Sequence, residues 1–285
     1  MLIASVLFVP LGAQDRASTE GVAIDADARS LQPGEIVRLT LTTATATDHL
    51  ALTAFGHSVT PFRLDALTWQ ALVGIDLDVP AGPALITIEP SASSPASTIV
   101  YRLVVKPKVF PTRRLTVNPD FVTPPPSVEA RIEAEAAELN QLWKSSSARL
   151  WTGAFVPPVP QAANSAFGSR SVFNGQARSP HGGADFASPE GTPVKAPGGG
   201  RVVLAKPLYY TGNTVVVDHG LGLVSLFAHF SAISVHEGDI VTAGTVLGRV
   251  GATGRVTGPH LHWTLRADGA RVDPLSLLAV TATPR

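Results

Sequence analysis

Three short stretches in the C-terminal half of the chain combine residue types that can bind a metal ion or transfer a proton. They supply four imidazoles and one carboxylate, in the segments His181-Gly-Gly-Ala-Asp185, Ala228-His229 and His260-Leu261-His262. Six of the eight histidines lie between residues 181 and 262. Zinc prefers these ligand types in catalytic sites, where three protein ligands leave one coordination position open. The sequence therefore predicts an enzyme with a metal site built from these stretches.

The spacing inside the stretches limits how they could work. Two glycines separate His181 from Asp185, and glycine costs about 1 kcal/mol relative to alanine inside a helix. We therefore expect an extended or looped segment, whose glycines let the backbone fold closely around a metal. In a strand, His260 and His262 would share one face about 7 Å apart, with Leu261 pointing into the core. This separation suits one ligand and one imidazole that reaches bound water or substrate, and spacing alone leaves the two assignments open.

His229 ends an apolar run that is typical of a strand, in which it would share a face with Phe227 and Ser225. A lone histidine at such a position is more often structural than catalytic. However, the chain has no His-Glu-x-x-His motif, so no glutamate is placed as the base of a zinc protease. General acid–base catalysis would then fall to His229 and to the histidine of the 260–262 pair that does not bind metal, because imidazole titrates near neutral pH.

Composition excludes several other classes of protein. Lys and Arg total 22, as do Asp and Glu, so the formal charge is zero and the basic excess of a nucleic-acid binder is absent. Without cysteine, the chain can form no disulfide, no thiolate zinc cluster and no cysteine nucleophile, so a metal site must use His, Asp and Glu. At 285 residues, the length suits two domains.

Residues 1–14 form an apolar run followed by small residues, which is typical of a secretory signal peptide, although the positively charged start is missing. The alternative is a buried first strand. The run is too short to cross a bilayer, and no other stretch has the length and hydropathy of a membrane span. We therefore expect an exported protein of the periplasm or cell envelope, without a membrane span in its mature form.

The rest of the chain predicts a mainly β protein. Residues 20–106 contain runs typical of strands, separated by turn signals, and indicate a β-sandwich-like domain. Residues 107–150 form a Pro-rich linker and one helix, which Ser127 would cap. The apolar stripe of this helix would pack on a neighbouring domain and consists of Val128, Ile132, Ala136, Leu139 and Trp143. Residues 151–280 predict a second, β-rich domain without a helix.

The remaining polar and aromatic residues near the three stretches have less specific interpretations. His219 is either structural or a support of the site from behind, and His49, His57 and His236 read as surface or strand histidines. Trp263 and the pair Tyr209-Tyr210 either line a groove or pack. Arg255 and Thr257 precede the His-Leu-His segment and are candidates for contact with substrate.

Taken together, the stretches resemble the motifs of the M23 (lysostaphin/LytM-type) zinc metallopeptidases, which cut peptide bonds in bacterial peptidoglycan. The resemblance rests on His181-x-x-x-Asp185, on Ala228-His229-Phe230-Ser231 and on Thr257-Gly-Pro-His260-Leu-His262-Trp263. It continues through Gly191-Thr-Pro-Val and Gly248-x-Val-Gly251 and covers nearly all of residues 165–276. The upstream β domain and the Pro-rich spacer resemble the bacterial subset that carries an N-terminal β domain.

The resemblance implies a role for each of the five positions. His181, Asp185 and His262 would be zinc ligands, and His229 and His260 would be the two catalytic histidines outside the coordination sphere. It also implies an antiparallel β metallopeptidase domain over residues 151–280, with a narrow groove across the metal. The expected function is a zinc-dependent endopeptidase that hydrolyses peptide bonds in peptidoglycan stem peptides or cross-links.

Two other interpretations remain. The first is a non-catalytic envelope module that binds peptidoglycan or regulates an amidase, as do members of the family that have lost ligands. All five positions are filled here, which argues against it. The second is an autoinhibited enzyme, in which the N-terminal domain or residues 106–180 cover the groove.

Overall fold

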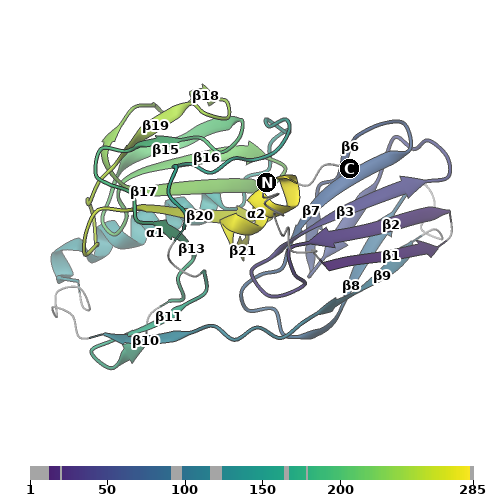
Figure 1. The fold of residues 1–285 in the computed structure, drawn as a ribbon, viewed down its shortest axis with the longest axis horizontal. Coiled ribbons are helices and arrows are strands. Elements are labelled where there is room, and N and C mark those ends of the chain that lie inside the picture. The colour runs from purple at the N-terminus through teal and green to yellow at the C-terminus, as the bar shows by residue number, and fades with distance from the viewer. Residues whose placement is uncertain are drawn as a thin grey trace, which may run out of the picture.

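Two β domains lie side by side, and the linker between them runs along the lower edge of both (Figure 1). The computed structural model describes residues 13–19, 21–90, 98–115, 124–163, 167–177 and 179–282. The elements are almost all antiparallel strands, which confirms the mainly β prediction. No helix in the described ranges is long and apolar enough to cross a membrane.

The N-terminal domain encloses an apolar core between two sheets. One sheet has the order β1-β2-β3-β7-β6 and the other β5-β4-β8-β9. The strands of the first are β1 (Ala13–Thr19), β2 (Val22–Ala28), β3 (Ile36–Thr43), β6 (Phe62–Arg63) and β7 (Thr68–Gly74). Those of the second are β4 (Ala51–Ala54), β5 (His57–Val59), β8 (Gly82–Glu89) and β9 (Ile99–Val105). Alternate residues point inward, as in β9, where Ile99, Tyr101, Leu103 and Val105 are buried.

The beginning of this domain borders the predicted signal peptide. β1 pairs with β2 along its whole length, so the domain begins before residue 20 and its first strand includes Ala13 and Gln14, the last two residues of the predicted signal peptide. Residues 1–12 of the predicted signal peptide lie outside the described residues.

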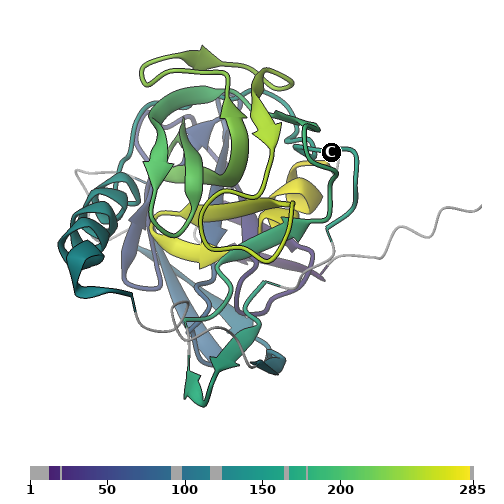
Figure 2. The same cartoon turned by 90° about the vertical axis from the view of Figure 1, so that its left-hand side faces the viewer.

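The linker contributes a strand and a helix to the C-terminal half. β10 (Thr112–Leu115) pairs with β11 (Arg170–Phe173), which pairs in turn with β12 (Gln176–Ala177). This three-stranded arm projects below the C-terminal domain, and α1 (Glu129–Leu142) lies against that domain's side (Figure 2).

The predicted helix exists, but its start differs from the prediction. Residues Pro126–Val128 form a 3-10 turn, Val128 occupies the N-cap position, and no side chain caps the helix, so the prediction for Ser127 was wrong. The turn places Ser127 inside an earlier helical segment, where it cannot occupy the extended cap conformation. Packing on the neighbouring domain is confirmed for Leu139 and Trp143, together with Leu142, whereas Ala136 is exposed.

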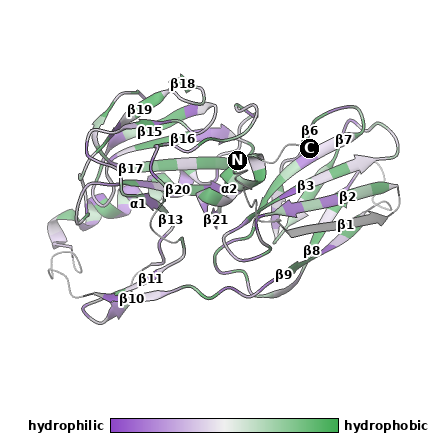
Figure 3. Cartoon of the chain, viewed as in Figure 1, coloured by the Kyte–Doolittle hydropathy of each residue, from purple (hydrophilic) through white to green (hydrophobic). Residues whose placement is uncertain are grey.

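The C-terminal domain is built on one nine-stranded antiparallel sheet. Its main path is β13-β20-β17-β16-β15-β18, with β14 and β19 paired beside β17 and β21 beside β20. The strands are β13 (Gly183–Phe186), β14 (Pro193–Lys195), β15 (Gly200–Leu208), β16 (Gly212–Gly220), β17 (Leu223–Ile233), β18 (Ile240–Val241), β19 (Val246–Val250), β20 (Leu261–Ala267) and β21 (Ala270–Val272). Apolar residues run along the central strands of this sheet (Figure 3).

A second helix, α2 (Pro274–Ala282), follows β21, so the prediction that residues 151–280 contain no helix was wrong. The run Leu275–Val280 is almost entirely apolar and too short to reveal a helical period. The informative signal was the pair Asp273-Pro274, because the Asp273 carboxylate accepts a hydrogen bond from the Leu275 amide at 3.0 Å and proline suits the first helical position.

α2 and the end of β20 join the two domains. Ile36 packs in one buried cluster with Leu265, Val272 and Leu277, and its amide donates to Ser276 Oγ at 2.7 Å. At the rim, the Arg29 guanidinium lies 2.5 Å from the Asp273 carboxylate. The domains are therefore held together through apolar packing and ion pairs.

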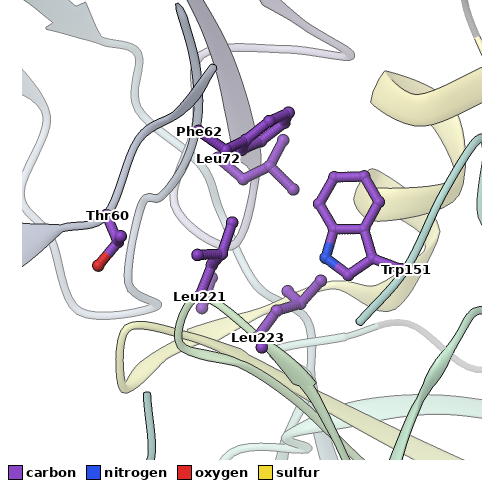
Figure 4. Close-up of a pocket in the computed structure, with 8 residues that line it drawn as sticks. Thr60, Phe62, Leu72, Trp151, Leu221 and Leu223 are labelled. Carbon is purple, nitrogen blue, oxygen red and sulfur yellow. The ribbon is translucent and has the colours of Figure 1, made fainter. Parts of the chain in front are cut away.

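A small cavity interrupts the packing between the domains. Figure 4 shows Phe62 and Leu72 of the N-terminal domain facing Trp151, Leu221 and Leu223. The cavity encloses about 10 Å³, which is close to the space that one water occupies. This gap is small, whereas two wider clefts of about 550 and 370 Å³ open between the domains at the edges of the interface.

The ion pair between Asp76 and Arg271 gives this interface a predictable pH dependence. Arg271 donates to Asp76 from its amide, from Nε and from Nη2 at 2.6–3.0 Å. Partial burial opposes ionisation, but these hydrogen bonds lower the pKa of Asp76 to about 2. Because that pKa lies below its unfolded value, the pair stabilises the fold above about pH 4, and the contribution disappears as the pH falls towards 2.

We therefore expect Asp76→Asn to reduce the free energy of unfolding by about 2 kcal/mol at pH 7, with the difference closing between pH 4 and 2. Urea denaturation over a pH series measures this. The control is Asp78→Asn, because Asp78 also contacts Arg271 at 2.6 Å but its side chain is 63% exposed, so its effect should be smaller. A difference between wild type and Asp76→Asn that is equal at pH 2 and pH 7 would contradict this assignment.

Candidate active site

The strand pair β13–β20 brings the first and third stretches together. Asp185 lies directly opposite His262 in this antiparallel pair, and His181 lies two residues before β13 begins at Gly183. The segment from His181 to Asp185 is therefore extended, as its glycines predicted. Leu261 is fully buried, whereas His262 points to the opposite face of the sheet, which also confirms the prediction for β20.

Three ligand atoms converge at this point. His181 Nε2 lies 3.1 Å from Asp185 Oδ1 and 3.1 Å from His262 Nδ1, and the latter two atoms are 2.7 Å apart. Zinc bonds of about 2.0–2.1 Å at tetrahedral angles place ligand atoms roughly 3.3 Å apart. The triangle is therefore close to the size that a tetrahedral metal requires, and these three residues form a group able to hold an ion.

The contacts around His262 also favour a cation at the centre of the triangle. His262 Nε2 lies 2.8 Å from Thr264 Oγ1, so a proton on Nε2 can be donated to that hydroxyl. In this tautomer the Nδ1 lone pair faces the Asp185 carboxylate, so both atoms can bind one cation between them. Outer partners of this kind commonly orient histidine ligands of metals.

At Asp185, burial and the neighbouring imidazoles shift the pKa of the carboxyl group in opposite directions. Burial would raise the pKa of the Asp185 carboxyl, but the adjacent imidazoles of His181 and His262 hold it well below its usual range. Burial lowers the pKa of His262, so its ring is neutral near pH 7. A carboxylate and a neutral imidazole are the forms in which both side chains bind metals.

Gly183 allows β13 to approach β20 closely enough to form this site. A Cβ atom at Gly183 would lie 2.2 Å from the Trp263 carbonyl oxygen, whereas one at Gly182 would meet nothing within 4 Å. The close approach is thus to a neighbouring strand, where backbone atoms cannot move aside without breaking the pairing. It is this approach, more than contact with a metal, that explains the glycine.

We expect Gly183→Ala to displace β13, lowering both metal affinity and stability, the latter by about 1–3 kcal/mol as for other overpacked positions. Gly182→Ala is the matched control, because it lies on the same segment and a Cβ atom at Gly182 would meet nothing within 4 Å. Calorimetric zinc titration and thermal unfolding of both variants test this. Equal behaviour of the two would show that the strand contact is unimportant.

A β-bulge in β17 directs His229 into the site. Phe227 pairs with Val215 and Phe230 with Asn213, so Ala228 and His229 together oppose Thr214. His229 has a φ of 67°, an uncommon conformation for a residue other than glycine. The prediction that His229 shares a face with Phe227 was wrong, because the extra residue breaks the alternation of the strand. Phe227 enters the core, whereas the His229 ring lies 4.8 Å from that of His260.

One loop orients both of these histidines. His229 Nδ1 lies 2.9 Å from the Thr253 carbonyl oxygen, and His260 Nδ1 lies 2.9 Å from the Gly258 carbonyl oxygen. A carbonyl oxygen only accepts, so each Nδ1 carries the proton and each Nε2 offers a lone pair. His260 Nε2 lies 3.8 Å from Asp185 Oδ1, at the edge of the metal-binding triangle. Burial lowers the pKa of His229 to about 4, which keeps its ring neutral near pH 7.

His219 supports the sheet from behind and lies outside the site. It is fully buried, with Nδ1 2.7 Å from the Gly199 carbonyl oxygen and Nε2 2.9 Å from Ser225 Oγ. Trp263 Nε1 donates to the same hydroxyl at 3.0 Å. Trp263 is therefore a core residue beneath the strand that carries His262.

Comparison with known proteins identifies the family. A model of peptidase family M23 matches residues 179–274. The structure also resembles a crystal structure assigned to peptidase M23 from Pseudomonas aeruginosa, with 34% sequence identity and a TM-score of 0.69, over 87% of this chain and 95% of that one. The chain belongs to peptidase family M23. A match of this extent includes the N-terminal β domain as well as the M23 domain.

Curated relatives match over a shorter region. DD-carboxypeptidase/endopeptidase Mpg from Neisseria meningitidis serogroup B is 45% identical over 101 residues, which are 35% of this chain and 23% of that protein. Peptidoglycan DD-endopeptidase ShyA from Vibrio cholerae serotype O1 is 46% identical over 96 residues, which are 34% of this chain and 22% of that protein. The match therefore spans less than a quarter of either relative's length.

The structure also places the other residues that the sequence singled out. His49, His57 and His236 are exposed and are not part of the metal-binding triangle. Tyr209 and Tyr210 stand at the β15–β16 turn, and Arg255 and Thr257 lie in the loop before His260. Sequence reasoning missed Thr253, whose carbonyl holds His229, because a backbone contact depends on loop conformation and leaves no signal in residue type.

Proposed function

We propose that the protein is a zinc-dependent endopeptidase that hydrolyses peptide bonds in peptidoglycan. The observation that carries this proposal is the convergence of His181 Nε2, Asp185 Oδ1 and His262 Nδ1 within 3.1 Å beside two imidazoles that are not part of the triangle. Membership of the M23 family and relatives named DD-endopeptidases support the substrate class. Their names favour a bond between two D-configured residues of a cross-link.

In this proposal, His181, Asp185 and His262 would hold the zinc. The chemistry that a zinc ion would supply there is that of a Lewis acid, which lowers the pKa of a water and polarises the scissile carbonyl. His229 and His260 remain outside the coordination sphere, each with Nδ1–H donated to a backbone carbonyl and Nε2 open towards the site. One Nε2 accepts the proton from the attacking water and later donates it to the leaving amine. The other imidazole, when protonated, stabilises the negative oxygen of the tetrahedral intermediate.

The location of the protein follows from this function. Peptidoglycan lies outside the cytoplasmic membrane, so we propose an exported protein of the periplasm or cell envelope, with a signal peptide that ends before β1 begins at Ala13. The competing proposal is a non-catalytic envelope module, which would require only binding. No observation favours it over hydrolysis, since the ligand triangle and both outer histidines are complete.

The test is to incubate the purified full chain, with and without one equivalent of zinc, with cross-linked muropeptides of known structure. Products are identified by mass spectrometry, and bound zinc is measured on the same sample. Cleavage that requires zinc, and that disappears with a chelator, would support the endopeptidase and identify its bond. A zinc-loaded protein that binds the muropeptides without cleaving them would support the non-catalytic module.

A further inference from the structure

Thr253, in the loop between β19 and β20, contacts both His229 and the residue that follows it. Its carbonyl oxygen lies 2.9 Å from His229 Nδ1, and its Oγ1 donates to the Phe230 carbonyl oxygen at 2.9 Å. The same Oγ1 accepts from the Asn213 amide of β16 at 2.9 Å. The hydroxyl therefore uses both its donor and its acceptor capacity to tie the loop to the two strands that meet at the bulge.

These contacts of Thr253 depend on its residue type to different degrees. Every residue has a carbonyl oxygen, so the bond to the His229 ring requires only that the backbone lie in the right place. The bonds to Phe230 and Asn213 require a hydroxyl group on a short side chain, because one atom both donates and accepts. The orientation of the His229 ring thus depends indirectly on a hydroxyl group of another residue.

Two glycines let this loop approach the start of β16 closely. A Cβ atom at Gly212 would lie 2.3 Å from Thr253 Oγ1 and 2.5 Å from the Thr253 carbonyl oxygen. A Cβ atom at Gly254 would lie 2.4 Å from the Gly212 amide nitrogen. Both glycines have positive φ, at 61° and 79°, where a side chain would also be strained. This close contact and the hydroxyl bonds together leave the Thr253 carbonyl little freedom.

The backbone of His229 is held by the same part of β16. Its amide donates to the Thr211 carbonyl oxygen at 2.9 Å, and Thr211 Oγ1 lies 2.8 Å from Thr214 Oγ1. With a φ of 67°, His229 has a backbone conformation that persists only where its surroundings impose it. Loss of one restraint therefore allows the ring to turn away from the orientation that the other contacts favour.

We infer that Thr253 is a positioning residue whose hydroxyl group fixes the His229 imidazole, with Nε2 open towards the site, for proton transfer. The inference rests on the proposed endopeptidase function and assigns Thr253 no contact with substrate or zinc. A misplacement of about 1 Å can cost roughly 100-fold in rate. The hydroxyl should therefore affect kcat and leave KM unchanged.

The first experiment compares Thr253→Val and Thr253→Ser in the zinc-loaded full chain. Valine has nearly the shape of threonine but lacks the hydroxyl, so kcat for cross-linked muropeptides should fall by about 10- to 100-fold, with native KM and zinc affinity. Serine restores the hydroxyl and should restore kcat. Thr245→Val is the matched control, because Thr245 Oγ1 also accepts from a backbone amide, that of Thr242 at 3.1 Å, but lies in the β18–β19 turn.

Combination with His229→Ala tests whether Thr253 acts through His229. If it does, adding Thr253→Val to the His229→Ala protein should lower kcat no further. A further loss of kcat in the double variant would overturn the inference, because Thr253 would then act by another route. Native kcat in Thr253→Val alone would overturn it as well.

The NMR spectrum of the His229 ring nitrogens, in protein with isotope-labelled histidine, provides a readout that does not depend on turnover. In the native zinc-loaded protein we expect a proton on Nδ1 and a lone pair on Nε2. Thr253→Val should give a mixture of the two tautomers, whereas Thr253→Ser and Thr245→Val should keep the native pattern.

This spectrum also separates the inference from the proposed function. A native protein that cleaves no muropeptide would contradict the endopeptidase, but the tautomers of His229 would still decide whether the Thr253 hydroxyl fixes the ring. A native pattern in Thr253→Val would overturn the inference whatever the kinetics show. So would a proton on Nε2 in the native protein, a measurement that needs no variant able to fold.

Discussion

The Asp185→Ala protein should lose zinc binding and hydrolysis together while keeping its fold. Asp185 supplies the carboxylate of the metal-binding triangle, and its Oδ1 lies within 3.1 Å of His181 Nε2 and His262 Nδ1. Losing even an outer hydrogen-bond partner of a metal ligand commonly costs 10- to 100-fold in affinity, so losing the ligand should cost more than about 100-fold. Hydrolysis should fall by at least about 100-fold, because loss of one transition-state contact already has this effect.

Zinc content by mass spectrometry and calorimetric titration measure the first effect, and muropeptide cleavage measures the second. Thr264→Val provides a graded comparison. It removes only the hydroxyl that lies 2.8 Å from His262 Nε2, so a loss of affinity of about 10- to 100-fold is expected. Asp48→Ala, at a fully exposed carboxylate of the N-terminal domain, should behave as wild type. An Asp185→Ala protein that still binds one zinc with native affinity would refute the proposed ligand set.

Residue types and short spacing predicted a metal site in the three stretches, because ligand chemistry is carried by residue type. Spacing alone left His260 and His262 open as the ligand, and the set His181, Asp185 and His262 came from the resemblance to the M23 motifs. The register that pairs Asp185 with His262 came from the structure, because register depends on long-range packing.

The placement of His229 was not predictable in the same way. Strict alternation put His229 on the face of Phe227, and a bulge one residue long reversed this. No residue type in the segment Ala228–Phe230 signals a bulge, because the signal is usually a glycine with positive φ. His229 instead adopts that conformation itself, with a φ of 67°, which is typical of strain retained at functional positions.

The domain interface depends on contacts that are distant in sequence. Arg29 and Asp273 are 244 residues apart, and Asp76 and Arg271 are 195 apart. Periodicity identifies each β domain but contains no information about which faces meet. The interface forms at the end of β20 that is remote from His262, so it holds the N-terminal domain against the M23 sheet without contributing to the metal-binding triangle.

Replacing His229 with alanine should separate catalysis from metal binding. Its ring lies 6.1 Å from that of His262 and 4.8 Å from that of His260, and no atom of it belongs to the triangle. We therefore expect His229→Ala to bind zinc with native affinity but to lose about 10²- to 10⁴-fold in kcat, the usual contribution of a general acid–base residue. Some stability should be lost as well, because the ring is buried and its Nδ1 donates to the Thr253 carbonyl oxygen, so thermal unfolding of the variant has to be measured beside its activity.

Single-turnover cleavage of a muropeptide, together with zinc titration of the same sample, tests this expectation. His260→Ala should give the same pattern, and the double variant should be little worse than either single variant if the two imidazoles act as a unit on one transition state. His236→Ala is the control, since its side chain is 91% exposed in a surface turn. Full activity of His229→Ala would mean that the bulge in β17 serves only the packing of the sheet, and His260 alone would then have to move the proton.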